Sequence, residues 1–215
     1  TQIAIKIPEL IVSDVMMPLM SGMEMCMKIK NNIELCHIPV VLLTALDSVE
    51  YNIEGLQQGA DDYISKPFHA KVLLMRCNNL IRNRLLLKSR LTKQVDFDVQ
   101  LLATTSLDQQ LLNRITEIVD QRMGEPDFDV NALARELNMG RSSFFTKIKN
   151  LTGMTPSEFI QNQRINRAAT LLQEQPDLLV NEISDRLGFA STVYFSRCFK
   201  AKFGVSPARF RKKEQ

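Results

Sequence analysis

Short apolar runs alternate with amphipathic segments in the N-terminal half of the chain. Two runs rich in branched apolar side chains cover residues 9–13 and 39–43, and a third predicted strand covers residues 62–65. Such runs are typical of strands buried in a parallel sheet. The segments between them that have helical patterns cover residues 22–32 and 48–58. The alternation of strand and helix predicts an α/β fold for this half.

A polar residue with useful chemistry follows each predicted strand. Because the carboxyl ends of parallel strands meet at one edge of a sheet, Asp14, Thr44 and Lys66 are expected to converge there. A carboxylate can attack phosphorus, a hydroxyl can donate to a phosphoryl oxygen, and an ammonium group can neutralise the added charge. The set therefore suits an acyl phosphate on Asp14. Each residue alone also has a simpler explanation, because Asp and Thr often cap the next helix and lysines are common on surfaces.

One long helix is predicted after the third strand. Apolar residues recur at nearly heptad spacing between Phe68 and Leu91, and Arg84 interrupts the pattern. The first turns are expected to pack on the sheet. Beyond about Arg84 the helix either pairs with a partner helix or forms a frayed linker. Residues 93–105 have no helical stripe and are assigned to the connection.

The C-terminal half contains the same helix, turn, helix pattern twice, with the two copies roughly fifty residues apart. In the second copy, Phe195, Phe199 and Phe203 recur every fourth residue and predict one buried helix face. Gly188 is expected to form the sharp turn before this helix, and Ser191 to cap it. The exposed face is expected to carry Thr192, Val193, Ser196, Arg197 and Lys200.

The first copy has an equivalent second helix, in which Phe144, Ile148 and Leu151 are expected to face inward. The residues left facing outward are Arg141, Ser142, Phe145, Thr146 and Lys149. An amphipathic helix from Ser106 is predicted before this copy. A long helix is predicted between the copies at residues 155–174, with Thr155 as its cap.

Charge and composition narrow the possible functions. The net charge is +3, and the excess lies in residues 105–215, which hold 16 basic and 13 acidic residues. A basic run near the C-terminus suits the phosphate backbone of double-stranded DNA, although charge runs are often only solvated helix faces. The four cysteines have no C-x-x-C spacing and the two histidines are scattered, so neither zinc nor disulfides are indicated and a reducing cytoplasm fits best. No apolar run is long enough to span a bilayer, so no membrane contact is expected.

Three motifs at the predicted strand ends resemble the receiver domain of two-component response regulators, which has a flavodoxin-like α/β fold. The motifs are SDVMMPLMSG at residues 13–22, LTA at 43–45 and GADDYISKPF at 59–68, and the resemblance covers residues 8–87. It implies that Asp14 is the phosphorylation site, supplied by a histidine kinase or a phosphotransfer domain. It further implies that Thr44 is the switch hydroxyl, Tyr63 the switch aromatic and Lys66 the phosphoryl-binding lysine.

The resemblance also implies a Mg²⁺ site, with Asp14 and the backbone carbonyl of Met16 as two ligands. In the family, an acidic pair on the first strand completes that site, but only about a dozen residues precede Asp14 here. We therefore expect a receiver that lacks its first strands in this sequence, with an incomplete metal site, and its phosphorylation is left open. The resemblance further implies a cis Lys66–Pro67 bond that turns Lys66 inward and a close packing of Gly22 below Asp14.

An enzyme of the haloacid dehalogenase type would also use an Asp nucleophile at a strand end, followed by Thr and Lys. That class needs a second Asp two residues further on, where this sequence has Met16. We therefore expect no catalytic residues and no turnover of an outside substrate. Kinase activity is expected only if domains upstream of this sequence supply it.

The pattern of residues 188–211, GFASTVYFSRCFKAKFGVSPARFR, is very similar to the second helix-turn-helix of the AraC/XylS transcription regulators. The resemblance implies that both reading helices enter successive major grooves, and that the long helix spaces them by about one DNA turn, on the order of 34 Å. Phosphate contacts are expected from Arg141, Lys149, Lys200 and Arg211. Base contacts are expected from Thr146, Thr192, Val193, Ser196 and Arg197, with Ser142 beside them and Phe145 against a thymine methyl.

The sequence thus predicts an incomplete α/β receiver at residues 1–88, a connector at 89–105 and an all-α domain with two helix-turn-helix units at 106–215. The favoured interpretation is a phosphorylation-controlled, sequence-specific transcription regulator that acts as a homodimer. Whether it is free or forms the cytoplasmic end of a membrane-anchored hybrid sensor kinase is left open. The alternative is a receiver that works as a signalling or docking module and binds DNA only non-specifically.

Overall fold

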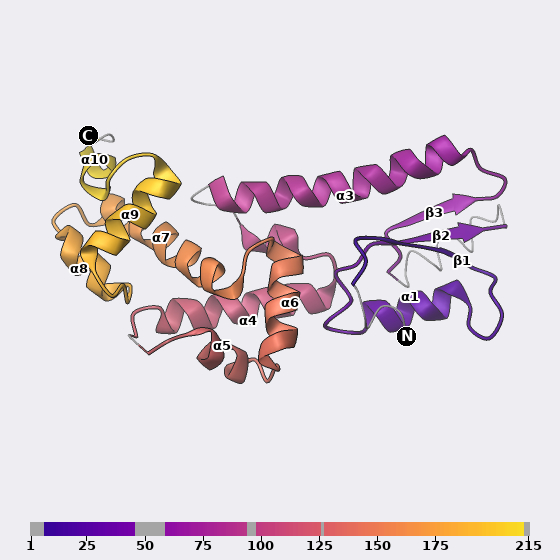
Figure 1. Cartoon of the computed structure of the whole chain (residues 1–215), viewed down its shortest axis with the longest axis horizontal. Coiled ribbons are helices and arrows are strands. Elements are labelled where there is room, and N and C mark those ends of the chain that lie inside the picture. The colour runs from indigo at the N-terminus through magenta and orange to yellow at the C-terminus, as the bar shows by residue number, and fades with distance from the viewer. Residues whose placement is uncertain (1–6, 46–58, 94–97, 126, 213–215) are drawn as a thin grey trace. The chain divides into compact units, whose positions relative to one another are not determined.

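The computed structural model describes residues 7–45, 59–93, 98–125 and 127–212 of the chain (Figure 1). Contacts between Cα atoms divide the chain into two compact units. The first comprises Thr1–Leu87 with Leu101–Gln110, and the second comprises Lys88–Gln100 with Leu111–Gln215. Each unit is built around its own apolar interior, and the domain boundaries given above stay predictions.

The first unit contains a parallel sheet of three strands in the order β1-β2-β3. The strands are β1 Ile11–Asp14, β2 Val40–Thr44 and β3 Asp62–Ser65. The central strand is the most apolar, and Val40, Val41 and Leu42 are fully buried, as expected for a strand covered on both faces. The three predicted strands and the α/β class are confirmed.

Helix α1, Gly22–Lys30, begins at a reciprocal cap in which the Ser21 hydroxyl accepts from Glu24 N–H and the Glu24 carboxylate accepts from Ser21 N–H. Its apolar face packs Cys26 and Ile29 against β2. The prediction of a helix over residues 22–32 is therefore confirmed. The second predicted helix, at residues 48–58, lies outside the described residues.

Helix α3, Ala70–Lys93, is a single helix of 24 residues, as its near-heptad pattern predicted. Arg84 takes an otherwise apolar position in that pattern because its guanidinium contacts polar groups of the first unit. Its guanidinium donates to the carbonyl of His37 and forms an ion pair of 3.2 Å with Asp61, which also pairs with Lys30 at 2.6 Å. The segment after α3 contains a short 3-10 helix, Val99–Leu102, which the sequence did not indicate.

The second unit consists of helices, which confirms its predicted all-α class. The helices that begin after α3 are α4 Ser106–Arg122, α5 Val130–Glu136, α6 Arg141–Thr152, α7 Pro156–Glu174, α8 Val180–Arg186, α9 Thr192–Phe203 and α10 Pro207–Lys212. The first turn of α4 belongs to the first unit, and the rest of that helix belongs to the second. The predicted cap of α7 is confirmed, since Thr155 accepts from Glu158 N–H and Pro156 occupies the first turn.

The repeat predicted within this half is visible in the helices. The pairs α5–α6 and α8–α9 have equal lengths, with seven residues in each first helix and twelve in each second helix. Both twelve-residue helices end at a left-handed glycine, Gly153 or Gly204, whose N–H donates to the carbonyl of Lys149 or Lys200. The two helix-turn-helix units therefore share one local design.

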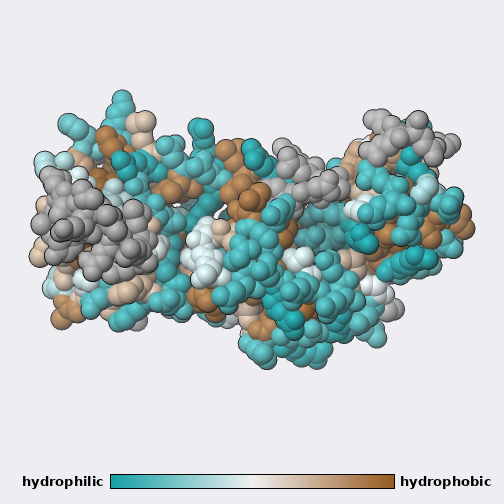
Figure 2. Space-filling model, turned by 180° about the vertical axis from the view of Figure 1, so that it is seen from behind, coloured by the Kyte–Doolittle hydropathy of each residue, from teal (hydrophilic) through white to brown (hydrophobic). Residues whose placement is uncertain are grey.

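Within the described ranges, none of the helices combines enough length with enough apolar character to span a bilayer. Figure 2 shows hydrophilic residues over most of one face of the protein, with apolar residues in separate patches.

Candidate functional site

The edge of the sheet at the strand ends brings Asp14, Thr44 and Lys66 together, as the sequence predicted. Asp14 is the last residue of β1 and Thr44 the last of β2, and Thr44 pairs in register with Ser65, the residue before Lys66. Lys66 N–H donates to the carbonyl of Thr44 at 2.7 Å. The side chain of Lys66 turns inward and forms an ion pair with the Asp14 carboxylate. The predicted cis bond between Lys66 and Pro67 is present.

Two donors stabilise the charged form of Asp14. One carboxylate oxygen accepts from the Lys66 ammonium group, and the other accepts from the backbone N–H of Met16 at 3.1 Å. The Lys66 hydrogen bond, with a smaller contribution from Met16, holds the pKa of Asp14 below its usual value. About a third of the Asp14 side-chain surface is exposed. Asp14 is therefore an ionised, accessible carboxylate beside a cation, which is the state needed for attack on phosphorus.

Gly22 lies directly under Asp14. A Cβ atom at Gly22 would lie 2.1 Å from the carbonyl oxygen of Asp14, a distance that real side chains do not adopt. The N–H of Gly22 also donates to the Val15 carbonyl at 2.9 Å. The expected close packing below Asp14 is thus present, and only glycine fits this position without movement of β1.

Tyr63 lies on β3 and packs its ring against the core cluster of Cys26, Ile29, Val40 and Leu42. Its hydroxyl is buried without a hydrogen-bond partner. Burial raises the pKa of Tyr63 to about 12. Thr44 is also buried, at 5% exposure. These are the two residues to which the switch roles were assigned.

The predicted metal ligands among the described residues are Asp14 and Met16. Within the described part of the chain, no group of three or more His, Cys, Asp or Glu side chains could hold a metal ion. Asp14 supplies a carboxylate, whereas Met16 is 74% exposed and contacts Asp14 through its N–H. The described residues thus supply part of the donor set that a Mg²⁺ site would need.

The first candidate reading helix, α6, presents all five of its predicted outward residues to solvent: Arg141, Ser142, Phe145, Thr146 and Lys149. Phe145 is 41% exposed, and the ammonium group of Lys149 lies 5.9 Å from its ring centroid. The opposite face is buried through Phe144, Ile148 and Leu151. An apolar ring beside a cation suits a DNA groove, where a thymine methyl lies close to phosphates.

The second candidate reading helix, α9, is anchored by aromatic side chains. Phe195 and Phe199 are fully buried, and the ring centroids of Phe199 and Phe203 lie 4.5 Å apart. The predicted cap is confirmed, because the Ser191 hydroxyl accepts from Tyr194 N–H at 3.2 Å. The predicted turn at Gly188 is also confirmed by its φ of 68°. The buried face therefore fixes which side chains of α9 remain outside.

The outer face of α9 differs in detail from the predicted one. Val193, Arg197 and Lys200 are exposed, and Val193 reaches 82% exposure. Thr192 and Ser196 are only half-exposed. The helix also exposes Tyr194, which was not among the predicted contacts, and the Arg197 guanidinium lies 5.3 Å from its ring centroid. The spacing of three residues between Tyr194 and Arg197 was the available signal for this pair.

Arg211 differs from the other predicted contacts because it has a structural partner. Its guanidinium donates to the backbone carbonyl of Leu178, and its Nε is buried without a hydrogen-bond partner. The residue is half-buried. A phosphate contact by Arg211 would compete with its hydrogen bond to Leu178, in the segment before α8. The phosphate contact predicted for Arg211 remains a prediction.

Comparison with known proteins finds a family match in each half of the chain. A family model described as a response regulator receiver domain matches residues 2–78, and one described as a helix-turn-helix domain matches residues 133–213. Histidine kinase P4 of Formosa agariphila is 44% identical over 205 residues, which cover 95% of this chain and 15% of that protein.

Two further relatives match shorter stretches of the chain. The Msm operon regulatory protein of Streptococcus mutans is 34% identical over 112 residues, which cover 52% of this chain and 40% of that protein. The response regulator PleD of Caulobacter vibrioides is 43% identical over 81 residues, which cover 38% of this chain and 18% of that protein. The chain thus spans less than half the length of each of these three relatives. It matches a response regulator receiver domain in its N-terminal half and a helix-turn-helix domain in its C-terminal half.

Proposed function

We propose that the protein is a phosphorylation-controlled, sequence-specific DNA-binding transcription regulator of a two-component system. The observation that carries the proposal is the presence in one chain of an ionised Asp14 beside Lys66 and of two helix-turn-helix units with exposed polar faces. Asp14 beside Lys66 supplies a phosphoryl acceptor. The two helix-turn-helix units supply a pair of reading helices. Neither kind of domain is an enzyme in its own right.

The phosphoryl group would reach Asp14 from a phosphohistidine of a kinase or a phosphotransfer domain. A P–N bond breaks as a P–O bond forms on the carboxylate, and the histidine leaves with the electron pair of the P–N bond. Lys66 already contacts the acceptor oxygen and neutralises the charge that the phosphoryl group adds. Receiver domains generally bind Mg²⁺, but the described residues supply only part of such a site, so no step is assigned to the ion.

The exposed residues of α6 and α9 divide by chemistry into two groups. Arg141, Lys149 and Lys200 carry positive charges suited to phosphates, which set affinity without reading sequence. Thr146 and Arg197 lie toward the middle of their helices and suit base edges in the major groove. Ser142, Phe145 and Val193 add exposed groups at the same faces, with Thr192 and Ser196 half-exposed beside them.

The division between base contacts and phosphate contacts can be tested by two substitutions. We expect Arg197→Ala to weaken binding to a selected duplex by about 1–3 kcal/mol while leaving binding to a scrambled duplex nearly unchanged. Lys149→Ala should weaken both complexes to a similar extent and reduce the salt dependence. Fluorescence anisotropy at two salt concentrations measures both quantities. Equal losses on both duplexes for Arg197→Ala would make it a phosphate contact and favour the non-specific docking module.

The similarity to histidine kinase P4 supports one arrangement in particular. Because the match extends over 95% of this chain, receiver and helix-turn-helix domain occur together in that relative. We infer that the protein acts as the regulatory output of a hybrid sensor kinase, whose kinase domain would be the phosphoryl donor. Immunoblotting of the native protein against this sequence tests the inference, since a band near the mass of a free regulator would contradict it.

A further inference from the structure

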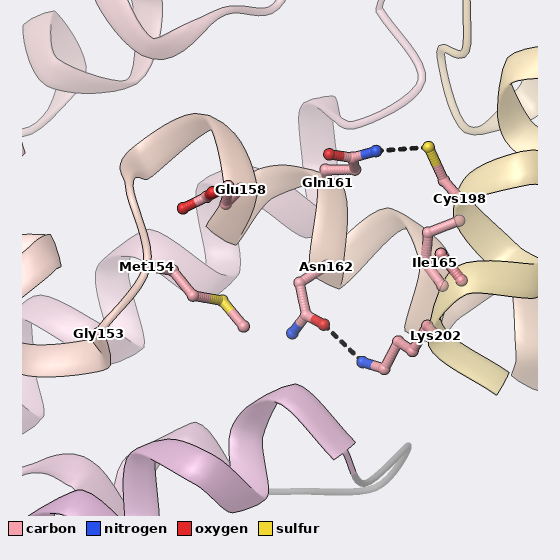
Figure 3. A pocket seen from close by; sticks show the side chains of 9 residues that line it. Gly153, Met154, Glu158, Gln161, Asn162, Ile165, Cys198 and Lys202 are labelled. Atoms are coloured by element: carbon pink, nitrogen blue, oxygen red, sulfur yellow. Dashed lines mark hydrogen bonds between the residues drawn. The ribbon is translucent and has the colours of Figure 1, made fainter.

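A pocket of about 450 Å³ lies in the second unit, between the long helix α7 and the reading helix α9 (Figure 3). Neither the receiver site nor the outer face of α9 uses it. The residues that line it come from both helices and from the turn before α7: Gly153, Met154, Glu158, Gln161, Asn162, Ile165, Cys198, Ala201 and Lys202. Its volume lies within the range of small-molecule sites.

The end of the pocket formed by Asn162 and Lys202 has more hydrogen-bond donors than acceptors. The Lys202 ammonium group donates to the side-chain oxygens of Asn162 and Asn166, which leaves one of its three protons for another acceptor. Asn162 is 8% exposed, and its side-chain nitrogen is buried without a hydrogen-bond partner. Figure 3 shows the oxygen of Asn162 facing Lys202 and its nitrogen turned the other way, on the side of Met154. A buried amide donor without a partner is unfavourable and favours a ligand that accepts from it.

The charge at this end of the pocket is positive. No carboxylate forms an ion pair with Lys202 in the part of the chain that the structure describes. Glu158 lines the pocket, but its carboxylate accepts from the N–H and the hydroxyl of Thr155, at 2.8 and 2.9 Å, and points away from Asn162 in Figure 3. Burial lowers the pKa of Lys202 to about 8, so its amine is still charged at neutral pH.

The remaining walls include the apolar side chains of Met154, Ile165 and Ala201. Such walls accept a short hydrocarbon chain. The Gln161 amide also lines the pocket, but it already donates to the Tyr194 hydroxyl and the Cys198 sulfur and so has no proton left for a further phosphate oxygen. We propose that the pocket binds a small organic carboxylate, with its two oxygens on Asn162 and Lys202 and its chain against Met154 and Ile165. The ligand would contact α7 and α9 together, and the proposal stands independently of the function proposed above.

Isothermal titration of the full chain with hexanoate tests the proposal. We expect saturable binding of one hexanoate per chain, and binding of 1-hexanol that is weaker by roughly tenfold or more, because the alcohol lacks the charge and one acceptor oxygen. Inorganic phosphate is the second probe and is expected to bind more weakly than hexanoate. Absence of saturable hexanoate binding, or phosphate binding tighter than hexanoate, would overturn the assigned ligand class.

Asn162→Asp is the sharpest variant, because it keeps the oxygen that accepts from Lys202 and replaces the free donor with a negative oxygen. We expect it to fold, as judged by circular dichroism, and to lose hexanoate binding by at least about tenfold. Lys202→Gln removes the charge while keeping an amide donor and should cause a similar loss. The control is Arg167→Gln, which removes an exposed positive charge elsewhere on α7 and should bind hexanoate like the wild type. Unchanged binding by folded Asn162→Asp would contradict the proposal.

The pH dependence supplies a second measurement that needs no variant. Hexanoate binds the charged form of Lys202, so affinity should be constant near neutral pH and fall as the pH rises through about 8. The other titratable groups that line the pocket are Glu158 and Cys198. Glu158 stays ionised above neutral pH, because its hydrogen bonds with Thr155 lower its pKa. Binding of hexanoate near pH 8 should therefore take up protons, and binding without proton uptake would exclude Lys202 as the partner.

Discussion

The packing under Asp14 is set by a single glycine. Gly22 leaves no room for a side chain, because its Cβ position lies 2.1 Å from the carbonyl oxygen of Asp14. Any substitution must therefore displace either β1 or the start of α1. Since β1 carries Asp14, the proposed phosphoacceptor, the geometry of Asp14 and Lys66 depends on this contact.

We expect Gly22→Ala to destabilise the first unit by about 1–3 kcal/mol through overpacking. Chemical denaturation followed by circular dichroism measures the change. Gly140→Ala is the control, because nothing lies within 4 Å of its Cβ position and its φ of −62° suits any residue. Equal stability of Gly22→Ala and the wild type would show that β1 can move without cost.

The buried hydroxyl of Tyr63 is a second feature at this scale. It has no hydrogen-bond partner although its ring is packed in the core of the first unit. We expect Tyr63→Phe to raise the free energy of unfolding by roughly 1 kcal/mol, because the substitution removes a buried polar atom that is not satisfied. Urea denaturation checks the sign. A loss of stability would indicate that the hydroxyl has an acceptor in solution.

The positions of functional side chains could be predicted from the sequence where the order of strands or the period of a helix determines which residues lie together. Asp14, Thr44 and Lys66 converge because parallel strands end at one edge of the sheet. Ser191 caps α9 because it lies directly before the helix in which phenylalanines recur every fourth residue. The partners of Arg211 and Lys202 were not predictable. Both belong to a basic run that indicated phosphate contacts, yet Arg211 contacts Leu178 and Lys202 contacts Asn162, each more than thirty residues away along the chain.

At the scale of elements, helix α3 leaves large apolar side chains in contact with solvent. Leu74, Met75 and Leu85 are each more than half exposed. Leu74 and Leu85 are eleven residues, or about three turns, apart and so lie on one face of the helix. We propose this face as the contact surface of the homodimer predicted from the sequence.

The double substitution Leu74→Glu with Leu85→Glu should convert a dimer to a monomer, because it places charges on the apolar face of α3 without loss of helix propensity. Light scattering after size exclusion reports the mass. Asn83→Glu adds a charge at an exposed position on another face of α3 and is the control. A double variant with the same mass as the wild type would exclude this face from the interface.

The sequence predicted the helices of the second unit well, because most of them carry both a periodic apolar face and a cap. The capped start of α7 and the aromatic face of α9 are examples. The short helix α10 and the 3-10 helix at Val99–Leu102 were not predicted. Segments of six residues or fewer contain too few helical periods to be recognised, and their conformation depends on packing. An example is Phe210 of α10, whose ring meets the ring of Phe199 edge to face with 5.3 Å between the centroids.

At the scale of the whole molecule, one chain carries both the proposed phosphoryl acceptor and the two candidate DNA-reading helices. The repeat of α5–α6 in α8–α9 fits the proposal that two similar surfaces act on one DNA molecule. The 19 residues of α7 between them extend about 28 Å at 1.5 Å per residue, which is close to one turn of DNA. A single reading helix would not need this spacing.

Selection of binding sites from a randomised DNA pool by the full chain tests this central claim most directly. The account predicts a two-part motif whose halves are centred about 10 base pairs apart, bound tightly at both low and moderate salt and lost on scrambling either half. Enrichment of no motif, with uniform binding that disappears as salt rises, would contradict it and leave a receiver with only non-specific affinity for DNA.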